Sequence, residues 1–310
     1  MNTVVNISKA SKSFGNVEAL KEISFEVNEG ELFGLIGPDG AGKTTLFRIM
    51  NTLLIPDSGS ATVLGSDVVE DYKIIRPQLG YMPGRFSLYL DLTVEENIQF
   101  FASVFGTRLE ENYDLVKPIY SQLEPFKNRR AGALSGGMKQ KLALSCALIH
   151  KPKLLLLDEP TTGVDAVSRK EFWEMLASLK NEGITIIVST PYMDEANLCD
   201  RVALIQKGEI LQIDTPDKIV NSFKKPLFGI KSQNKYKLLQ VLQNYQWTDS
   251  VHPFGEYIHY TDIRDKTSRE TLDDYLHEQG ISEVEIISIK PNIEDVFMAL
   301  MSGEREGINE

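Results

Sequence analysis

Residues 37–45 read GPDGAGKTT, and this stretch decides the fold. It matches the spacing G-x-x-x-x-G-K-[ST], with Gly37, Gly42, Lys43 and Thr44 at the fixed positions. The apolar run ELFGLI before it is typical of a strand, and TLFRIMNTLL after it is typical of a helix. A glycine-rich loop that opens a helix surrounds phosphate oxygens with backbone N–H groups, while its lysine reaches the outer phosphates and its hydroxyl holds Mg²⁺. The stretch therefore predicts a binding site for a nucleoside triphosphate.

A second motif, LLLLDEP at residues 154–160, ends an apolar run in two carboxylates. Carboxylates after a strand are often ordinary surface residues, but a neighbouring phosphate loop gives them a chemical use. We expect Asp158 to bind Mg²⁺ and Glu159 to polarise the water that attacks the terminal phosphate.

Length and composition set limits on the class of protein. A chain of 310 residues predicts two domains, and its formal charge of -11 argues against a nucleic-acid partner. The apolar runs are shorter than the ~20 residues of a membrane-spanning helix, and MNTVVNISKASKS lacks the apolar region of a signal peptide. The sequence thus predicts a soluble, cytoplasmic protein. Cys146 and Cys199 are expected to be plain buried thiols.

The order of apolar runs predicts an α/β fold. ELFGLIG, KLLLLDE, ITIIVST and RVALIQ alternate with helical stretches, which favours a parallel sheet covered on both faces, and KGEILQID reads as a closing hairpin around Gly208. Near residues 221–226 the pattern changes. LFGIKS, YIHYT and EVEIISI are expected strands, separated and followed by the helical stretches KYKLLQVLQNY, SRETLDDYLHEQG and IEDVFMALM, so residues 223–310 predict a small α+β domain.

The stretch LSGGMKQKL, residues 134–142, lies just before the carboxylate motif and resembles the signature of ATP-binding cassette proteins. The resemblance implies a P-loop NTPase cassette with a parallel-rich sheet at residues 1–222, including a helical subdomain at about 85–135. It implies ATP and Mg²⁺ as ligands, with Thr44 and Asp158 at the metal and Glu159 as the catalytic base. The implied nucleotide-binding residues are Phe14, which would stack on adenine, and Gly37, Pro38, Asp39, Gly40, Ala41, Gly42, Lys43, Thr44 and Thr45.

The resemblance also implies partners. Ser135, Gly136 and Gly137 begin a helix and so form a second anion site, which in this family closes on the nucleotide of an opposing subunit. Asp165, in GVDA, resembles the loop that crosses between the two subunits. The closing stretch IKPNIEDVFMALM resembles the tail of exporter cassettes, including drug-resistance and polysaccharide exporters, that work with separate membrane permeases. The resemblance thus implies an ATPase subunit on the inner face of the cell membrane, coupling hydrolysis to transport.

Two positions depart from the family pattern. Pro191 stands where the resembling proteins have a histidine that contacts the terminal phosphate, and Gly84 stands where they have a glutamine. Loss of such a group costs ~10²–10⁴ in rate, while the phosphate loop carries most of the binding. We therefore expect slow hydrolysis at this chain's own site, within a dimer of two different cassette subunits. A homodimer, a non-hydrolysing nucleotide-gated adaptor and a soluble non-transport cassette ATPase stay open as alternatives.

Overall fold

The computed structural model describes residues 2–264 and 267–306. The chain divides into two compact units, Met1–Pro216 and Asp217–Glu310, each of which is described by itself. This division falls after the first residue of helix α7 (Pro216–Ser222), whereas the sequence pattern placed it after residue 222.

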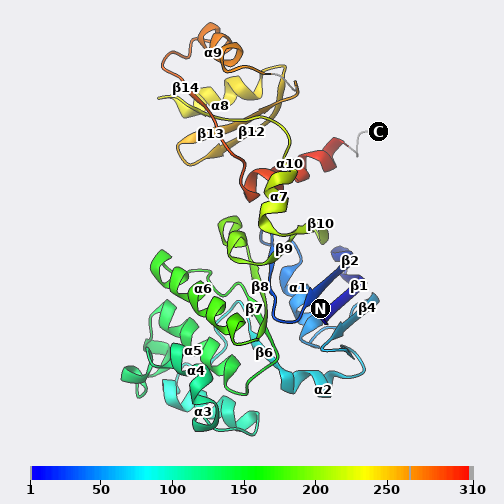
Figure 1. The fold of residues 1–310 in the computed structure, drawn as a ribbon, viewed down its shortest axis with the longest axis vertical. Helices are drawn as coiled ribbons and strands as arrows, with labels where there is room; N and C mark the ends of the chain where they lie inside the picture. Colours follow the sequence, from blue (N-terminus) through cyan, green and yellow to red (C-terminus); the bar gives the residue numbers. More distant parts are fainter. Residues whose placement is uncertain (1, 265–266, 307–310) are drawn as a thin grey trace. The chain divides into compact units, whose positions relative to one another are not determined.

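The first unit contains a six-stranded sheet in the order β10-β9-β3-β8-β7-β6 (Figure 1). The five strands from β9 to β6 are parallel, and β10 pairs with β9 as an antiparallel hairpin, so the predicted parallel-rich sheet and hairpin are both confirmed. Every residue of β3 and β7 is buried, as expected for strands covered on both faces. The strands are β3 (Leu32–Ile36), β6 (Leu79–Met82), β7 (Leu154–Asp158), β8 (Thr185–Thr190), β9 (Arg201–Gln206) and β10 (Glu209–Asp214).

A second, antiparallel sheet of the first unit was not predicted. It has the order β2-β1-β4-β5, formed by β1 (Thr3–Phe14), β2 (Val17–Asn28), β4 (Ser58–Val63) and β5 (Ser66–Asp67). Its inner residues share one core with helix α1 (Lys43–Met50) and with one face of the six-stranded sheet. The expectation of strands alternating with helices throughout the first unit was therefore wrong for its first 30 residues, where β1 and β2 pair directly.

The helices of the first unit are α1, α2 (Tyr72–Ile75), α3 (Val94–Val104), α4 (Tyr113–Tyr120), α5 (Gly136–Leu148) and α6 (Ala166–Asn181). Helices α3 and α4 lie within the expected helical subdomain, and α5 packs against both. Thr93 and Glu96 form a reciprocal capping box at the start of α3. The helical region is thus attached to the sheet through α5, the helix that begins with the signature glycines.

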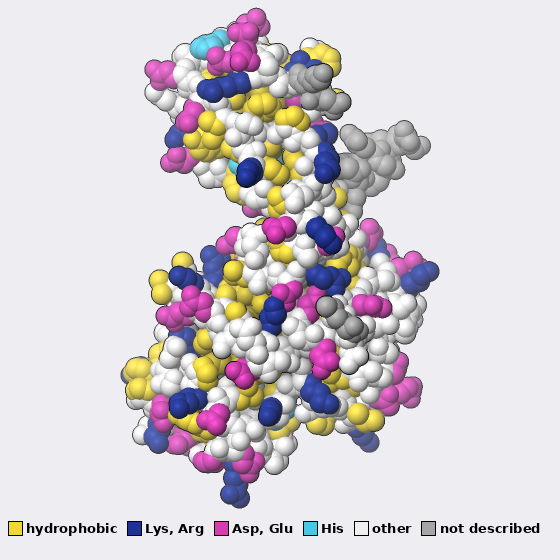
Figure 2. All heavy atoms as spheres, viewed as in Figure 1, with side chains coloured by type: hydrophobic (Ala, Val, Ile, Leu, Met, Phe, Trp, Pro, Cys, Tyr) yellow, Lys and Arg dark blue, Asp and Glu magenta, His cyan; other side chains and the backbone are white. Residues whose placement is uncertain are grey.

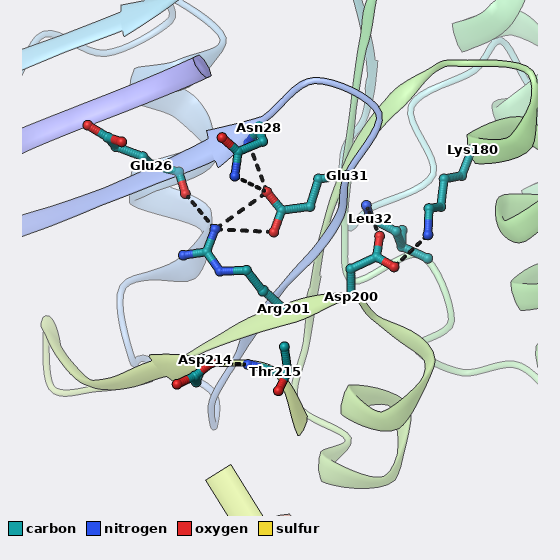
Figure 3. A network of polar contacts seen from close by, with 9 residues as sticks. All are labelled: Glu26, Asn28, Glu31, Leu32, Lys180, Asp200, Arg201, Asp214 and Thr215. Atoms are coloured by element: carbon teal, nitrogen blue, oxygen red, sulfur yellow. Dashed lines mark hydrogen bonds and ion pairs between the residues drawn. The ribbon is translucent and has the colours of Figure 1, made fainter. Parts of the chain in front are cut away.

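A polar network fixes the amino-terminal edge of the six-stranded sheet (Figure 3). Arg201 contacts the carboxylate of Glu31 at 3.2 Å and the carbonyl oxygen of Glu26 at 3.3 Å, which ties β9 to the end of β2. Asp200 accepts a hydrogen bond from the backbone N–H of Leu32 at 2.8 Å and pairs with Lys180. These contacts hold the strands in register at the edge opposite the phosphate loop.

The second unit has one four-stranded antiparallel sheet in the order β12-β13-β11-β14. Its elements run β11 (Leu227–Lys231), α8 (Lys235–Gln243), β12 (Thr248–Phe254), β13 (Tyr257–Asp262), α9 (Arg269–Glu278), β14 (Glu285–Ser288) and α10 (Ile293–Glu306). This succession is the split βαβ arrangement. Strand β12 was not predicted, because TDSVHPF is polar and contains Pro253, a residue tolerated only in an edge strand such as this one.

Charged side chains of both signs are interspersed over the face drawn in Figure 2. No helix in residues 2–264 and 267–306 is both long and apolar enough to cross a membrane.

Candidate functional site

The phosphate loop connects β3 to α1 at the carboxyl edge of the parallel strands. The backbone N–H of Gly37 donates to the carbonyl oxygen of Thr190 at the end of β8, at 3.2 Å. Gly208, in the β9–β10 hairpin, donates to Ala41 at 2.9 Å and accepts from the backbone N–H of Lys21 at 2.8 Å. The loop is therefore anchored to the end of β8 and to the turn between β9 and β10, and that turn is itself bonded to β2.

Two glycines of this loop have no room for a side chain. A Cβ at Gly37 would lie 2.1 Å from the carbonyl oxygen of Ile205. Gly42 has a φ of 109°, and a Cβ there would lie 2.6 Å from the carbonyl oxygen of Ala19. Glycine is required at both positions, by close backbone approach and, at Gly42, also by the left-handed backbone.

Lys43 is 2% exposed, and its ammonium group contacts three oxygens. It donates to the carbonyl oxygens of Gly37 at 2.7 Å and Pro38 at 3.0 Å, and it pairs with the Glu159 carboxylate at 3.1 Å. The predicted catalytic carboxylate and the predicted phosphate lysine are therefore in direct contact.

A cavity of about 670 Å³ opens beside these groups, large enough for a small ligand. It is lined by Asn16, Val17, Glu18, Ala19, Lys21, Asp39, Gly40, Gly42, Lys43, Thr44, Thr45, Glu159 and Lys207. Most of the predicted phosphate-loop residues line it together with Glu159. Phe14 is not among the lining residues. It lies at the end of β1, 48% exposed, with the Lys12 ammonium 5.9 Å from its ring centroid, so its contact with adenine stays a prediction.

Asp158 lies at the end of β7 and is buried. Its Oδ1 accepts a hydrogen bond from the Ser189 hydroxyl at 2.6 Å. The backbone N–H of Glu159 also donates to Ser189, and Glu159 has a φ of 50°, a left-handed conformation that non-glycine residues adopt rarely. Strand β8 thus holds both carboxylates of the motif in place.

Burial, together with the nearby Asp158 carboxylate, raises the pKa of Tyr81 to about 12. The phenol on β6 therefore stays neutral and adds no charge beside Asp158.

The two departures from the family pattern fall next to these groups. A Cβ at Gly84 would lie 3.1 Å from the carbonyl oxygen of Asp158 and 3.7 Å from the Cβ of Glu159. Pro191 directly follows Thr190, whose carbonyl oxygen binds the phosphate loop. Neither residue has a side-chain hydrogen-bonding group. His150 does not replace them, because its Nε2 contacts the Leu79 carbonyl at 2.8 Å and burial lowers its pKa.

The signature residues begin helix α5. Ser135 is its N-cap, and its hydroxyl accepts from the backbone N–H of Met138 at 3.4 Å. A Cβ at Gly137 would lie 2.8 Å from the Ser168 hydroxyl, and a Cβ at Gly136 would lie 3.8 Å from the carbonyl oxygen of Gly163. The start of α5 therefore packs against the segment that carries Asp165.

Asp165 caps helix α6. Its carboxylate accepts from the backbone N–H groups of Ser168 at 3.0 Å and Val167 at 3.1 Å. The hydrogen bond from the Ser168 backbone lowers the pKa of Asp165 below its ordinary value, so the cap is ionised at neutral pH. The structure gives Asp165 a local structural role, and its contact with another subunit stays a prediction.

Sequence reasoning missed one buried carboxylate near the site. Glu195 is 2% exposed and contacts Thr161 and Thr190, which follow the carboxylate motif and end β8 respectively. The stretch YMDEA gives no signal of it, because an acidic run at a helix start is usually exposed.

A second cavity, of about 360 Å³, is mainly apolar and lies between the sheet edge and the helical region. It is lined by Asn51, Leu53, Arg76, Leu79, Tyr81, Met82, Pro83, Ser87, Leu88, Phe101, Phe105, Ala143, Cys146, Ala147 and His150. Phe105 stacks on His150 with ring centroids 3.7 Å apart. This groove is separate from the cavity at the phosphate loop.

Comparisons with protein families, protein sequences and solved structures all find ATP-binding proteins of ABC transporters. A family model described as ABC transporter matches residues 20–162. The chain is 40% identical to the probable multidrug ABC transporter ATP-binding protein YbhF of Escherichia coli over 97% of its own length, and it spans 53% of that protein. It is 34% identical to Nod factor export ATP-binding protein I of Sinorhizobium fredii, over 98% of this chain and 87% of that one. A dimeric ATP-binding cassette solved in a post-hydrolysis state with ADP and Pi matches with a TM-score of 0.61 and 25% identity, over 68% of this chain and 98% of that chain.

Proposed function

The chain belongs to the ABC transporter family of ATP-binding proteins, and on that premise we propose that it binds and hydrolyses ATP to drive export through a separate membrane permease. The observation that carries the proposal is the cavity in which the phosphate loop, Lys43 and Glu159 meet. The chain spans about half the length of its E. coli relative, so activity and partners of the whole assembly belong to the proposal.

Magnesium fits the residues beside this cavity. Thr44 supplies a hydroxyl oxygen at the cavity wall, and Asp158 supplies a carboxylate at the end of β7. Residues 2–264 and 267–306 contain no cluster of three or more His, Cys, Asp or Glu side chains suited to a metal. A site with only two protein ligands suits Mg²⁺, which keeps waters and takes further oxygens from substrate phosphates. Bound there, the ion would neutralise charge on the phosphates.

A second cassette subunit completes the proposed site. Ser135 and Gly136 form the N-terminus of α5, and a helix N-terminus favours an anion. This N-terminus packs against the segment that carries Asp165. The solved relative that contains ADP and Pi is a dimer. We assign the signature of this chain to the nucleotide held by the partner subunit.

The apolar groove between the sheet and the helical region is the proposed contact for the permease. Tyr89, Leu90 and Phe100 are exposed near it, so the helical region presents apolar side chains to a partner. This contact would hold the chain on the inner face of the membrane. Co-purification with the membrane subunit in detergent tests it, and recovery of the chain only as a free soluble protein would favour a non-transport cassette ATPase.

The site itself is proposed to turn over slowly, within a dimer of unlike subunits. Gly84 and Pro191 leave the region beside Asp158 and Glu159 without two polar side chains, whereas the phosphate loop is intact. Removal of a group that positions the water costs ~10²–10⁴ in rate with little loss of ground-state binding.

The test places Glu159→Gln in this chain and, separately, the equivalent change in the partner subunit. Steady-state phosphate release should fall much more for the partner's change. Equal losses from both would refute the asymmetry, and release that is absent even from the unmodified complex would favour the non-hydrolysing adaptor.

A further inference from the structure

Glu195 is a buried carboxylate to which no role has been assigned. It lies in the 3₁₀ turn Met193–Leu198 that follows Pro191, and it is 2% exposed. Burial of a carboxylate without strong partners is costly, so its retention calls for a structural or functional reason.

One oxygen of this carboxylate joins two segments of the candidate site. Oε2 accepts a hydrogen bond from the Thr190 hydroxyl at 2.5 Å and another from the Thr161 hydroxyl at 3.2 Å. Both threonines are almost fully buried. Thr190 ends β8 and binds the phosphate loop through its carbonyl oxygen, whereas Thr161 begins the loop between Glu159 and Asp165.

The other oxygen, Oε1, is buried and has no hydrogen-bond partner among the described residues. The Nε of Arg169 lies 3.9 Å from this oxygen, at the distance of a weak ion pair. Arg169 belongs to helix α6, which Asp165 caps, and its guanidinium lies over the ring of Tyr192 with 5.0 Å to the centroid. The turn after Pro191 is thus linked to α6 as well as to Thr161.

We propose that Glu195 is a positioning residue that holds the loop of residues 161–165 against the end of β8. It acts through Thr161 and Thr190 and does not touch the nucleotide. Pro191 has no side-chain hydrogen-bonding group, whereas Glu195 connects the turn after β8 to Thr161 in the loop of residues 161–165. The effect on turnover rests on the proposed ATPase function, whereas the effect on the loop does not.

The experiment compares Glu195→Ala, Glu195→Gln and Glu31→Ala in the full chain. Glu31 is a matched control, since it is also a buried carboxylate of the first unit but lies at the opposite edge of the sheet. Hydrogen–deuterium exchange reports on the loop, a fluorescent ATP analogue reports on binding, and phosphate release from the complex with the second cassette subunit reports on turnover.

Glu195→Ala should speed exchange in residues 161–165 by about tenfold or more, with residues 154–158 and 37–45 unchanged. It should lower kcat by roughly 10–100-fold, the usual cost of displacing a catalytic segment, with nucleotide affinity within twofold. Glu195→Gln should keep the exchange rate of residues 161–165 and kcat near those of the unmodified chain, because its amide oxygen can accept hydrogen bonds from Thr161 and Thr190. Glu31→Ala should leave exchange of residues 161–165 unchanged.

Exchange of residues 161–165 within twofold of the unmodified chain in a folded Glu195→Ala protein would overturn the proposal. Equal changes from Glu31→Ala would overturn it too, as evidence of general destabilisation. Should Glu195→Ala not fold, Thr161→Val removes one of the two hydrogen bonds, and unchanged exchange in that variant would overturn the proposal in the same way. Failure of the unmodified chain to bind the analogue would instead refute the proposed function, while the exchange result would still decide the role of Glu195.

Discussion

At the scale of single residues, Lys43 is held in place by more polar contacts than a surface lysine usually makes. Its ammonium group is buried and surrounded by three oxygens, two from the loop backbone and one from Glu159. Charge-assisted hydrogen bonds of this kind are the stronger ones in proteins. The lysine is therefore held ready for the phosphates of a ligand.

Lys43→Ala should weaken ATP binding by roughly 10–100-fold, since loss of a charged hydrogen-bonding group costs about 1.5–3 kcal/mol. Isothermal titration calorimetry measures the effect. Lys170→Ala is the control, because Lys170 is exposed on α6 and pairs with Glu174 on the same helix. Unchanged affinity in Lys43→Ala would contradict the assignment of the phosphate loop.

Pro191→His should raise the turnover of this chain's own site by at least tenfold, because a histidine there can donate to the terminal phosphate. Gly84→Gln is the harder change, since a Cβ at that position would crowd the carbonyl oxygen of Asp158. Single-turnover phosphate release with the partner's site inactivated isolates the effect. No increase, in a protein that still binds ATP, would show that the slow site has another cause.

Sequence could predict the residues of the phosphate loop and Asp158–Glu159, because each set is contiguous and its chemistry depends on fixed spacing. It could not predict Glu195, whose partners Thr161 and Thr190 come from two other segments. Only the packing of the loop after β7 against the end of β8 brings them together.

At the scale of elements, the β9–β10 hairpin supports the nucleotide loop. Gly208 has a φ of 79°, and a Cβ there would lie 2.7 Å from the carbonyl oxygen of Ala19. The same residue joins Ala41 to Lys21 through its backbone. The hairpin forms the edge of the sheet through β10, and its Lys207 also lines the cavity.

Gly208→Ala should lower the free energy of unfolding by about 2–4 kcal/mol, from left-handed strain plus overpacking. Gly183→Ala is the matched control, because Gly183 has a φ of 88° but open space around its Cβ position, so it should lose only about 1–2 kcal/mol. Urea unfolding followed by circular dichroism compares them. Equal losses would mean that the contact with Ala19 adds nothing.

Helix α3 gives a prediction with a defined pH dependence. Hydrogen bonds from the Thr93 backbone and side chain lower the pKa of Glu96 below its ordinary value. The stability from this carboxylate is then fully present above its unfolded pKa and is lost as the pH falls through its lower, folded pKa. Glu96→Ala should lower the free energy of unfolding at pH 7 and should lower it less at pH 3, because the carboxylate that accepts from the Thr93 backbone N–H is ionised only at the higher pH. Urea unfolding at the two pH values measures both losses. A cost that grows on acidification would contradict the capping box.

The strands that the sequence did not predict are rich in polar residues. Strand β12 contains a proline, and β1 and β2 are long strands with one exposed face, so their polar residues masked the strand pattern. The buried parallel strands were predictable because they are almost wholly apolar.

At the scale of the whole molecule, the chain has two compact units with separate cores. The core of the second unit is built from residues of β11, β13, β14, α8 and α9, among others. A separate hydrophobic core is what allows a domain to fold on its own.

Residues 1–216 alone should therefore fold and bind ATP with an affinity within about threefold of the full chain, because every residue lining the nucleotide cavity lies in that unit. Calorimetric titration and circular dichroism of the excised unit check this. A fragment that is unfolded, or folded without binding, would show that the second unit is needed for the site.

The contact between Lys43 and Glu159 has a consequence for the timing of catalysis. An incoming terminal phosphate must compete with the Glu159 carboxylate for the Lys43 ammonium. Binding of the nucleotide would therefore also release Glu159 to act as the base. Nucleotide binding and activation of the base would then be a single step, and Glu159 would stay paired with Lys43 until a nucleotide arrives.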